Sequence, residues 1–448
     1  MYLLYKNLPV SAQNLMCSLY GYLSEKKRKR TPASDIYIRC TISELEEYQR
    51  SRLRSHILSA SKTQYWSNQF SRLGVDVCKD EPFDVLSKLP ITSKSDVQGN
   101  EALFLNSDYA PSSLNEVATS GSTGAGLRFW ETKSAEVERW SCWWRYRSIN
   151  GISTNDLCAV FGGQKIVPID IDKPPFFRMN RPSKQVLFSS YHLNEKNIQN
   201  YVDSLNKYQP PWIHGYPSVI YLLSKLAISK RIKLKYKPKI ITFGSEGLLD
   251  YQTEVIRNFF KCRLVQHYGL AESVANISEY PDGKLRIDED FSYVELIKIE
   301  GLEGTYKLVG TNWSNPAFPL LRYDTGDVVV SSNSGLIEGH YNGRVIDKID
   351  GRIESIISLP SGKKIGRIAG IFKAYPEIKE AQLVQKKDFS VEIRIVAIKE
   401  FEKKLEKKLL ASLDALFLNE LPLSIVYLEQ IDRTKSGKIR FVISEISF

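Results

Sequence analysis

Eight consecutive small residues, 118–125, form the part of this sequence whose composition points most directly to chemistry. They combine serine and threonine hydroxyls with two glycines and with backbone N–H groups that no bulky side chain shields. Glycine adopts the positive φ angles that turn successive amides toward one point, so such a loop can bind a phosphate. A GxxxxGK[ST] phosphate loop is excluded, because Leu127 and Arg128 follow the segment. A solvent-exposed turn has the same composition and stays open as the alternative.

Five further short motifs follow this segment along the chain. Each of them alone suits a strand-end turn, a helix start or a hairpin loop. They are FGSEG (243–247), HYGLAES (267–273), PLLRYDTGD (319–327), KIDGRIESI (348–356) and RTKSGKIR (433–440). Together with TSGSTG (119–124), in this order and at these intervals, they resemble the adenylate-forming superfamily. That superfamily contains acyl-CoA synthetases, aryl-CoA ligases and the adenylation domains of peptide synthetases.

The resemblance is strongest to the phenylacetate-CoA ligase branch and, within it, to the capsule-biosynthesis ligases of the CapK type. It spans nearly the whole chain and is carried by NLPVSAQNLMCSLYGYLSEKKR (7–28), LPITSKSDV (89–97), WIHGYPSVIYLLSKLA (212–227) and FPLLRYDTGD (318–327). It implies an ATP-dependent, AMP-forming carboxylate ligase. Such an enzyme would convert a carboxylic or amino acid to its adenylate, releasing pyrophosphate. It would then transfer the acyl group to a CoA thiol or an amine, in surface-polysaccharide biosynthesis.

The same resemblance implies which residues would hold the triphosphate and its Mg²⁺ ion. The β- and γ-phosphates would be held by Thr119, Ser120, Gly121, Ser122, Thr123 and Gly124. A loop without a fixed lysine can open to release pyrophosphate. Glu272 matches the glutamate that helps to hold Mg²⁺, a hard cation that prefers oxygen ligands. Family members usually have threonine just before it, whereas this chain has Ala271, so one hydroxyl contact to the α-phosphate is open to question.

The nucleoside contacts implied by the resemblance come from four motifs. Asp327 matches the aspartate that accepts both ribose hydroxyls with its two carboxylate oxygens. Arg352 matches an arginine near the ribose. Arg344 is a competing alignment, and Arg352 is preferred because the LPSGKKI turn follows it. The residues that match those around adenine are Ser245, Glu246, Gly247, Tyr268 and Gly269.

Lys438 matches the C-terminal lysine that bridges the substrate carboxylate and the α-phosphate while the adenylate forms. A compact ammonium group on a flexible stem can neutralise charge on both groups. Because this lysine lies in the small C-terminal domain, that domain must swing in and then out, and the expected hinge is around Gly351 and Arg352.

The resemblance also places an acyl pocket near His214 and Tyr216. His267 is a further candidate for contact with the acyl substrate, with an ordinary satisfied histidine beside the site as the alternative. Trp140, Trp143 and Trp144 cluster on an expected helix, where core packing is favoured over a role as pocket wall.

No zinc site is expected. Relatives in this branch often carry a cysteine and histidine metal site shortly after the glutamate. The corresponding segment here, ISEYPDGKLRIDED (277–290), contains neither residue type.

The elements that must position these motifs alternate between strand and helix from about residue 117 to 330. Strand-like runs occur at 156–163, 238–246 and 262–269, and helical patterns at 217–230 and 249–260. This alternation is typical of α/β proteins, in which strand ends lead into loops that carry a site. The motif LPITSKSDV predicts that a helix begins at Ser93 or Ser95.

After residue 350 the pattern becomes that of a compact α+β unit. Strands are expected at 352–359, 378–385, 391–398 and 423–431, with a helix at 365–375 and an amphipathic lysine-rich helix around 401–416. We therefore predict a large multi-sheet α/β N-terminal domain, residues 1–347, that binds ATP and the carboxylate. A small mobile α+β C-terminal domain, residues 348–448, would carry the adenylation lysine.

Composition excludes several other classes of protein. The chain has 448 residues, of which 42% are hydrophobic, and six scattered cysteines without a CxxC pair, which argues against a disulfide framework. Polar residues interrupt its apolar start before a signal peptide or membrane span can form, so a cytoplasmic protein is expected.

The net charge of +11 includes the basic run EKKRKR (25–30). This run suits a solvated helix end, although peripheral contact with anionic lipid stays open. Nucleic acid is not expected as a partner, because no nucleic-acid-binding module accompanies the charge. A catalytically silent nucleotide-binding or scaffold protein at the membrane surface is the alternative function, and the retained Glu272, Asp327 and Lys438 argue against it.

Overall fold

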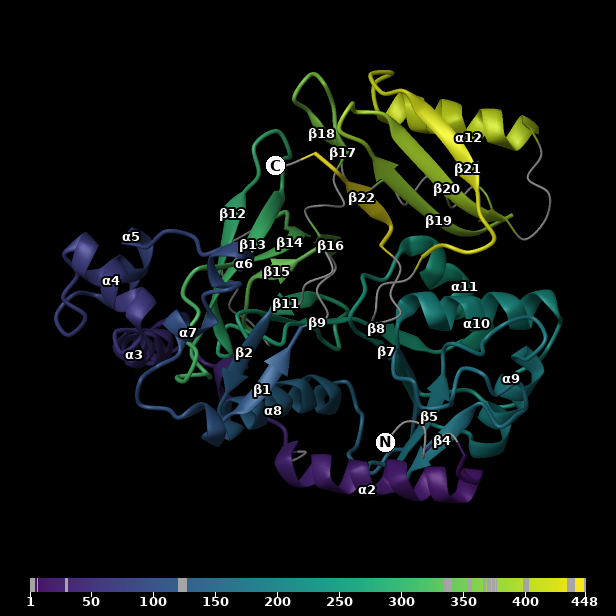
Figure 1. Cartoon of the computed structure of the whole chain (residues 1–448), viewed down its shortest axis with the longest axis horizontal. Coiled ribbons are helices and arrows are strands. Elements are labelled where there is room, and N and C mark those ends of the chain that lie inside the picture. The colour runs from purple at the N-terminus through teal and green to yellow at the C-terminus, as the bar shows by residue number, and fades with distance from the viewer. Residues whose placement is uncertain are drawn as a thin grey trace.

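A computed structural model of the chain shows a large N-terminal lobe and a smaller C-terminal lobe (Figure 1). It describes residues 5, 7–28, 31–119, 127–333, 335, 341–352, 357–365, 368, 372, 375, 377–397, 403–432 and 440–446, without the side chains of 25–28, 350–352, 364, 379 and 404. Three predictions fall wholly or mostly outside the described residues. They concern the loop residues Ser120, Gly121, Ser122, Thr123 and Gly124, the lysine Lys438, and the helix expected at 365–375.

A six-stranded, mostly parallel sheet forms one half of the N-terminal lobe. Its order is β4 (Phe177–Asn180), β5 (Gln185–Ser189), β3 (Cys158–Gly162), β6 (Trp212–Gly215), β7 (Ile240–Phe243) and β8 (Arg263–Val265), with only β4 antiparallel to its neighbour. The crossover helices are α9 (Ile198–Tyr208), α10 (Pro217–Ser229) and α11 (Asp250–Phe260). Phe161, Ile213 and Ile241 are fully buried in one core with these helices, because parallel strands are covered on their faces. The predicted α/β alternation is confirmed.

Two antiparallel four-stranded sheets form much of the other half of this lobe. One contains β15 (Val345–Ile346), β11 (Leu285–Ile287), β10 (Asn276–Glu279) and β9 (His267–Gly269), and the other β12 (Ser292–Lys298), β13 (Thr305–Asn312), β14 (Tyr323–Val330) and β16 (Lys348–Arg352). A separate hairpin pairs β1 (Asn115–Ala118) with β2 (Arg128–Glu131). The HYGLAES motif therefore begins on β9, and the DTGD residues lie within β14.

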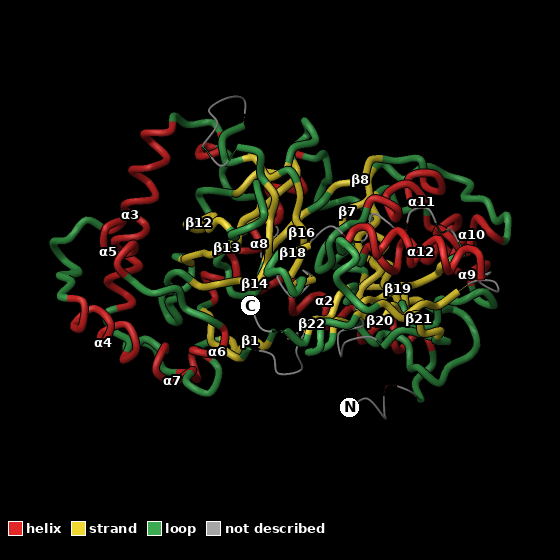
Figure 2. Tube along the Cα trace, turned by 90° about the horizontal axis from the view of Figure 1, so that it is seen from above, coloured by secondary structure: helices red, strands yellow, loops and turns green. Residues whose placement is uncertain are grey.

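Helices close both ends of the N-terminal lobe. In both views α3 (Ile42–Ala60), α4 (Gln64–Leu73) and α5 (Pro82–Lys88) lie at the end opposite α9 and α10 (Figures 1 and 2). The remaining elements of this lobe are α2 (Val10–Arg28), η1 (Ile36–Ile38), α6 (Lys94–Val97), α7 (Glu101–Phe104), η2 (Pro111–Ser113) and α8 (Lys133–Ile149).

The LPITSKSDV motif both starts a helix and docks on a strand of the site. Ser93 caps α6 in a capping box with Asp96, which confirms the predicted start at Ser93. The amide of Thr92 donates to the carbonyl of Arg322 (2.9 Å), and the amide of Asp324 donates to Thr92 (2.9 Å). This motif is therefore hydrogen-bonded to the beginning of β14.

The C-terminal lobe is a mixed sheet covered by one amphipathic helix. The sheet order is β21 (Leu423–Tyr427), β20 (Val391–Ala397), β19 (Ile378–Gln385) and β22 (Val442–Ser444), beside a small hairpin of β17 (Ile357–Ser358) and β18 (Lys364–Ile365). Helix α12 (Lys403–Leu416) buries Leu409 and Leu413 and exposes Lys407 and Lys408. The amphipathic lysine-rich helix is thus confirmed.

Strand β16 belongs to the N-terminal lobe. It is antiparallel to β14, with Arg352 opposite Asp327 and Lys348 opposite Val330. These ladder hydrogen bonds hold residues 348–352 to the N-terminal sheet, next to the expected domain boundary at residue 347.

Strand β13 packs so closely against the segment before β10 that Gly310 has no room for a side chain. A Cβ atom at Gly310 would overlap the carbonyl oxygen of Val274, which is backbone and cannot rotate away.

We predict that Gly310→Ala lowers the free energy of unfolding by about 1–3 kcal/mol, because the backbone must shift to admit the methyl group. Urea unfolding followed by fluorescence measures this loss. In the control Gly162→Ala the new Cβ meets no atom within 4 Å, so a change below about 0.5 kcal/mol is expected. Equal losses in the two variants would contradict the close approach.

Candidate active site

The serine- and glycine-rich loop is closed at its base by two hydrogen bonds. The amide of Thr119 donates to the carbonyl of Leu127 (2.8 Å), and the amide of Leu127 donates to Oγ1 of Thr119 (2.9 Å). The Leu127 side chain is fully buried and anchors the returning chain. The loop therefore extends the β1–β2 hairpin, and Thr119 serves to close it.

The turn that follows β7 lies next to β16. A Cβ atom at Gly247, in the FGSEG motif, would lie 3.7 Å from the carbonyl oxygen of Ile349. Ser245 has a φ of +69°, in the left-handed region, where this motif turns. Oε2 of Glu246 accepts the amide of Ser218 (3.1 Å) at the start of α10, where a carboxylate is favoured by the helix dipole. The FGSEG and KIDGR motifs, about a hundred residues apart, are thus brought together.

Tyr268 and Asp327 are in direct contact. The Tyr268 hydroxyl donates to Oδ2 of Asp327 (2.7 Å), and the Asp327 amide donates to Oγ1 of Thr325 (3.0 Å). Asp327 is largely buried, and the backbone of Arg352 is its partner across the β14–β16 ladder. Three residues that the resemblance assigned to the nucleoside therefore converge at one point, and Gly269 follows directly on β9.

Arg344, the competing candidate for the ribose arginine, is bound elsewhere. Its Nε and Nη2 donate to Oε1 and Oε2 of Glu289 (2.8 and 3.0 Å), and Nη2 also donates to the carbonyl of Val294 (2.6 Å). The charge of Glu289 helps to raise the pKa of the Arg344 guanidinium against the opposing effect of burial. This arginine therefore has a structural partner at a position away from the Asp327 ladder.

Arg139 links the segment of Glu272 to β2, the strand that follows the candidate phosphate loop. The Arg139 guanidinium makes a two-pronged ion pair with Glu131 on β2 (2.6 and 3.1 Å) and donates to the carbonyl of Ala271 (3.0 Å). Nδ2 of Asn312 donates to the carbonyl of Glu272 itself (3.0 Å). Arg139 was not among the residues singled out from the sequence, where nothing distinguishes it from a surface arginine of an ordinary helix.

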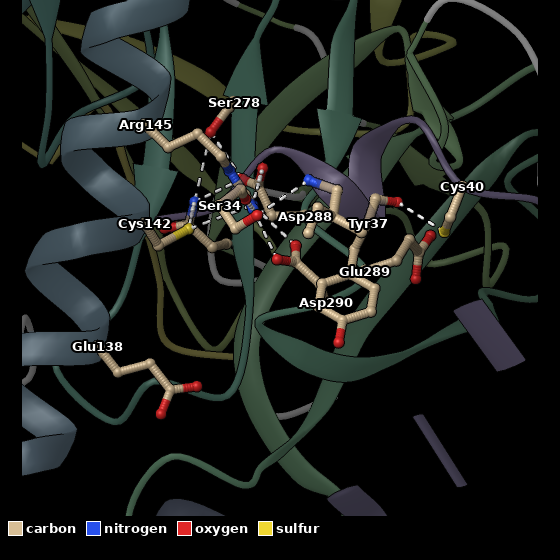
Figure 3. Close-up of polar contacts among 12 residues, drawn as sticks. Ser34, Tyr37, Cys40, Glu138, Cys142, Arg145, Ser278, Asp288, Glu289 and Asp290 are labelled. Carbon is tan, nitrogen blue, oxygen red and sulfur yellow. Dashed lines mark hydrogen bonds and ion pairs between the residues drawn. The ribbon is translucent and has the colours of Figure 1, made fainter. Parts of the chain in front are cut away.

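A second buried arginine on α8 fastens the strands beside the site. The guanidinium of Arg145 binds both carboxylate oxygens of Asp290 (2.6 and 2.7 Å) and Oδ1 of Asp288 (3.2 Å) (Figure 3). Asp288 in turn accepts Nδ2 of Asn276 and the hydroxyl of Ser278, each at 2.6 Å. Burial raises the pKa of Asp288 and the charge of Arg145 opposes this rise. The network holds β10, and through it β9, against α8. Several of its residues belong to the segment 277–290.

His267 is held by the same network. Its Nε2 lies 3.1 Å from Oδ1 of Asn276, which also accepts Nε1 of Trp143 (3.0 Å). Because the Asn276 amide nitrogen donates to Asp288, its oxygen is the acceptor, so His267 donates from Nε2 and keeps Nδ1 as an acceptor. Tyr146 stacks on the imidazole with 4.7 Å between ring centroids. Burial and then the charge of Arg147 lower the pKa of His267 to about 3.

His214 has a similar environment at the end of β6. Its Nδ1 is hydrogen-bonded to Oγ1 of Thr242 (2.9 Å), which also accepts Nε1 of Trp212 (2.8 Å). Burial, followed by the charge of Arg147, lowers the pKa of His214 to about 3. Tyr216 follows two residues later, and burial raises the pKa of its hydroxyl. Both histidines are therefore neutral at physiological pH.

The tryptophans of α8 divide between core and site. Trp144 is buried beside Trp212 in a core cluster, with the Arg147 guanidinium over both rings at 4.9 and 5.3 Å. Trp143 instead reaches Asn276 and lies edge-on to His267, with ring centroids 5.7 Å apart. Core packing is thus confirmed for Trp144, whereas Trp143 lies beside the residues expected at the acyl pocket.

Solved structures place this architecture among adenylate-forming ligases. The chain matches the structure of 2-hydroxyisobutyryl-CoA ligase in the postadenylation state with a TM-score of 0.67 and 14% identity, covering 91% of each chain. It matches the amide bond synthetase McbA from Marinactinospora thermotolerans with a TM-score of 0.50 and 14% identity, covering 73% of this chain and 67% of the other. The expected fold class, a large multi-sheet lobe with a small C-terminal α+β lobe, is confirmed.

A family model and a curated relative both carry the name CapK. Residues 357–445 match the family described as CapK C-terminal domain. The whole chain is 26% identical to Protein CapK of Staphylococcus aureus over 449 aligned positions, which cover 99% of both proteins. The resemblance to CapK is therefore confirmed, and the likeness to adenylate-forming ligases is confirmed for the fold.

No helix in the described part of the chain is both long and apolar enough to cross a membrane.

We predict that the His267→Gln variant loses less stability in acid than the wild type does. The folded protein keeps His267 neutral down to about pH 3, whereas the unfolded chain takes up a proton near pH 6.5. Stability from this group is therefore complete above pH 6.5 and is lost as the pH falls toward 3. The free energy of unfolding, measured in urea at pH 6, 5 and 4, should fall less steeply in the variant, by about 1.4 kcal/mol per pH unit. An unchanged slope would show that His267 is not held neutral.

Proposed function

We propose that this protein is an ATP-dependent, AMP-forming carboxylate ligase. It would convert a carboxylic or amino acid to an acyl-adenylate and then transfer the acyl group to an acceptor. The observation that carries the proposal is the convergence of Tyr268, Asp327 and the backbone of Arg352 on a chain with the fold of adenylate-forming ligases. The β1–β2 loop and the FGSEG turn supply the remaining expected nucleotide contacts.

In the proposed nucleotide site, separate segments bind the phosphates, the ribose and the adenine. The loop from Thr119 to Gly124 binds the β- and γ-phosphates through amides and hydroxyls. Asp327 accepts the ribose hydroxyls, and the residues around adenine are Ser245, Glu246, Gly247, Tyr268 and Gly269. We assign the ribose arginine to Arg352, because Arg344 is engaged by Glu289.

Glu272 fits the role of a Mg²⁺ ligand. Its carboxylate is of the type that Mg²⁺ prefers, and its segment is tied by Arg139 to the strand that leaves the phosphate loop. Among the described residues, no group of three or more histidine, cysteine, aspartate or glutamate side chains could hold a metal. A Mg²⁺ ion held by Glu272 would neutralise phosphate charge.

The acyl pocket is proposed to be formed by His214, Tyr216 and His267, with Trp143 beside them. Because both histidines are neutral, they would orient the substrate by hydrogen bonds and not by charge. No general base is needed for the first step, since a carboxylic acid with a pKa near 4 is already ionised at pH 7. The carboxylate oxygen attacks the α-phosphorus, and the bond to the β-phosphate breaks as pyrophosphate leaves.

The second step passes the acyl group to a CoA thiol or to an amine. Both acceptor classes are represented among the structural relatives, since one is a CoA ligase and the other an amide bond synthetase. The CapK likeness supports a place in surface-polysaccharide biosynthesis, and we propose a cytoplasmic location. We also propose an adenylation domain, residues 1–347, and a mobile C-terminal domain, residues 348–448; the pairing of β16 with β14 supports a connection close to this boundary.

We predict that ATP–pyrophosphate exchange, assayed with a panel of carboxylic and amino acids, identifies at least one acid that supports turnover. Asp327→Asn should raise the KM for ATP at least about tenfold, because the carboxylate that would accept the ribose hydroxyls is lost. The matched control is Asp324→Asn on the same strand, whose carboxylate lies 3.7 Å from Lys307. Its KM should stay near that of the wild type. Absence of exchange with every acid would favour the silent nucleotide-binding or scaffold alternative.

We further predict that Lys438→Ala abolishes adenylate formation and largely spares transfer from a synthetic acyl-adenylate. The ammonium is needed only while charge accumulates on the carboxylate and the α-phosphate. Single-turnover assays of the two half-reactions measure this separation. Equal losses in both half-reactions would contradict the proposed alternation of the C-terminal domain.

A further inference from the structure

Helix α2 contacts the rest of the protein through its polar face. Nε of Arg178 donates to Oε1 of Gln13 (2.6 Å), and the amide of Met179 donates to Oδ1 of Asn14 (2.8 Å). The hydroxyl of Ser18 donates to the carbonyl of Met179 (3.2 Å). A surface helix normally turns its apolar face to the protein, so the amphipathicity of α2 is inverted.

The close contact extends along the same inward face. A Cβ atom at Gly21 would overlap the side chain of Asn180, so the helix backbone lies directly against β4. The chain before the helix also lies on the inward side, where the Tyr5 hydroxyl donates to the carbonyl of Ile166 (2.7 Å). Among the described residues, these contacts fix the orientation of α2 through its inward face.

The opposite face of α2 is a continuous apolar stripe exposed to solvent. Leu15, Leu19 and Tyr20 are 71%, 59% and 67% exposed, and Leu23 is 54% exposed. With Met16 and Tyr22 these residues recur at helical spacing and cover one side of the helix. Single exposed apolar residues are normal, whereas a contiguous stripe marks an interaction surface.

Charge in the sequence indicates what covers this stripe. No aspartate or glutamate occurs in residues 1–24, and five basic residues occupy 26–30. Lys26 and Lys27 follow Tyr22 and Leu23 by four residues within α2, so their positions fall on the outward face of the helix. An apolar face with tyrosines and a basic end is typical of a helix lying in the interface of an anionic membrane.

We propose that the outward face of α2 is a docking surface for an anionic lipid membrane, with the helix lying in the plane of the headgroups. An anionic bilayer is favoured over a second copy of the chain, because the α2 helix of another copy carries the same positive charge. In Figure 1, α2 runs along the side of the molecule away from the C-terminal lobe. Docking would thus leave that lobe free to move. This proposal does not depend on the proposed ligase activity.

Co-sedimentation of the full-length protein with vesicles tests the proposal. Vesicles of phosphatidylcholine with phosphatidylglycerol should bind at least about tenfold more strongly than phosphatidylcholine alone. Leu19→Ser with Leu23→Ser should weaken binding to the anionic vesicles about tenfold or more, because apolar area no longer enters the interface. Lys26→Gln with Lys27→Gln should produce a loss of similar size on anionic vesicles only.

Matched variants elsewhere on the surface serve as controls. Leu58→Ser with Ile228→Ser removes two exposed apolar side chains of other helices, and Lys79→Gln with Lys88→Gln removes two exposed charges. Both should bind vesicles as the wild type does, and thermal unfolding should show that all variants are folded.

Two results would overturn the proposal. One is equal sedimentation of the wild type and the Leu19/Leu23 variant with anionic vesicles. The other is a dimer of the wild type in light scattering without lipid that the Leu19/Leu23 variant converts to a monomer. That outcome would make this face an interface between copies of the chain.

Discussion

Helix α8 joins the parts of the candidate site through two buried arginines. Arg139 links the strand leaving the phosphate-loop candidate to the segment of Glu272, and Arg145 links the helix to Asp288 and Asp290. Removing one partner of such a pair leaves an uncompensated charge in the interior, at a cost of about 3–5 kcal/mol. The relative positions of the nucleotide motifs therefore depend on these ion pairs, which come from a helix that contributes none of the expected nucleotide contacts.

The hydrogen bonds around Asn276 connect the buried Asp288 to Trp143 and His267 at the expected acyl pocket. Asn276 uses its amide nitrogen on Asp288 and its oxygen on Trp143 and His267, so each side chain fixes the hydrogen-bonding direction of the next. Burial and the nearby charge of Arg147 keep His267 and His214 neutral. The proposed acyl pocket would thus be lined by fixed dipoles, and the proposed mechanism assigns the positive charge needed during adenylate formation to Lys438 of the C-terminal domain.

The proposed nucleotide site and the proposed membrane-docking face lie on different elements of the molecule. The nucleotide motifs lie at strand ends of the N-terminal lobe, whereas α2 docks through its polar residues on the edge strand β4 and turns its apolar residues outward. A membrane contact through α2 and a mobile C-terminal lobe are therefore compatible, because neither uses the surface of the other.

The sequence by itself determined the α/β alternation, the α6 start at Ser93, the lysine-rich helix α12 and the order of the nucleotide motifs. These features depend on local periodicity, on capping chemistry and on short motifs, all of which are properties of neighbouring residues. Only the tertiary structure decided that Asp327 lies against Tyr268 and opposite Arg352, that Arg344 is engaged by Glu289, and that Arg139 and Arg145 are buried. It also decided that the apolar side of α2 faces outward, whereas the sequence showed only the basic run at its end. Burial and long-range pairing decide these points, and they arise from how distant segments pack, which the spacing of residues along the chain does not encode.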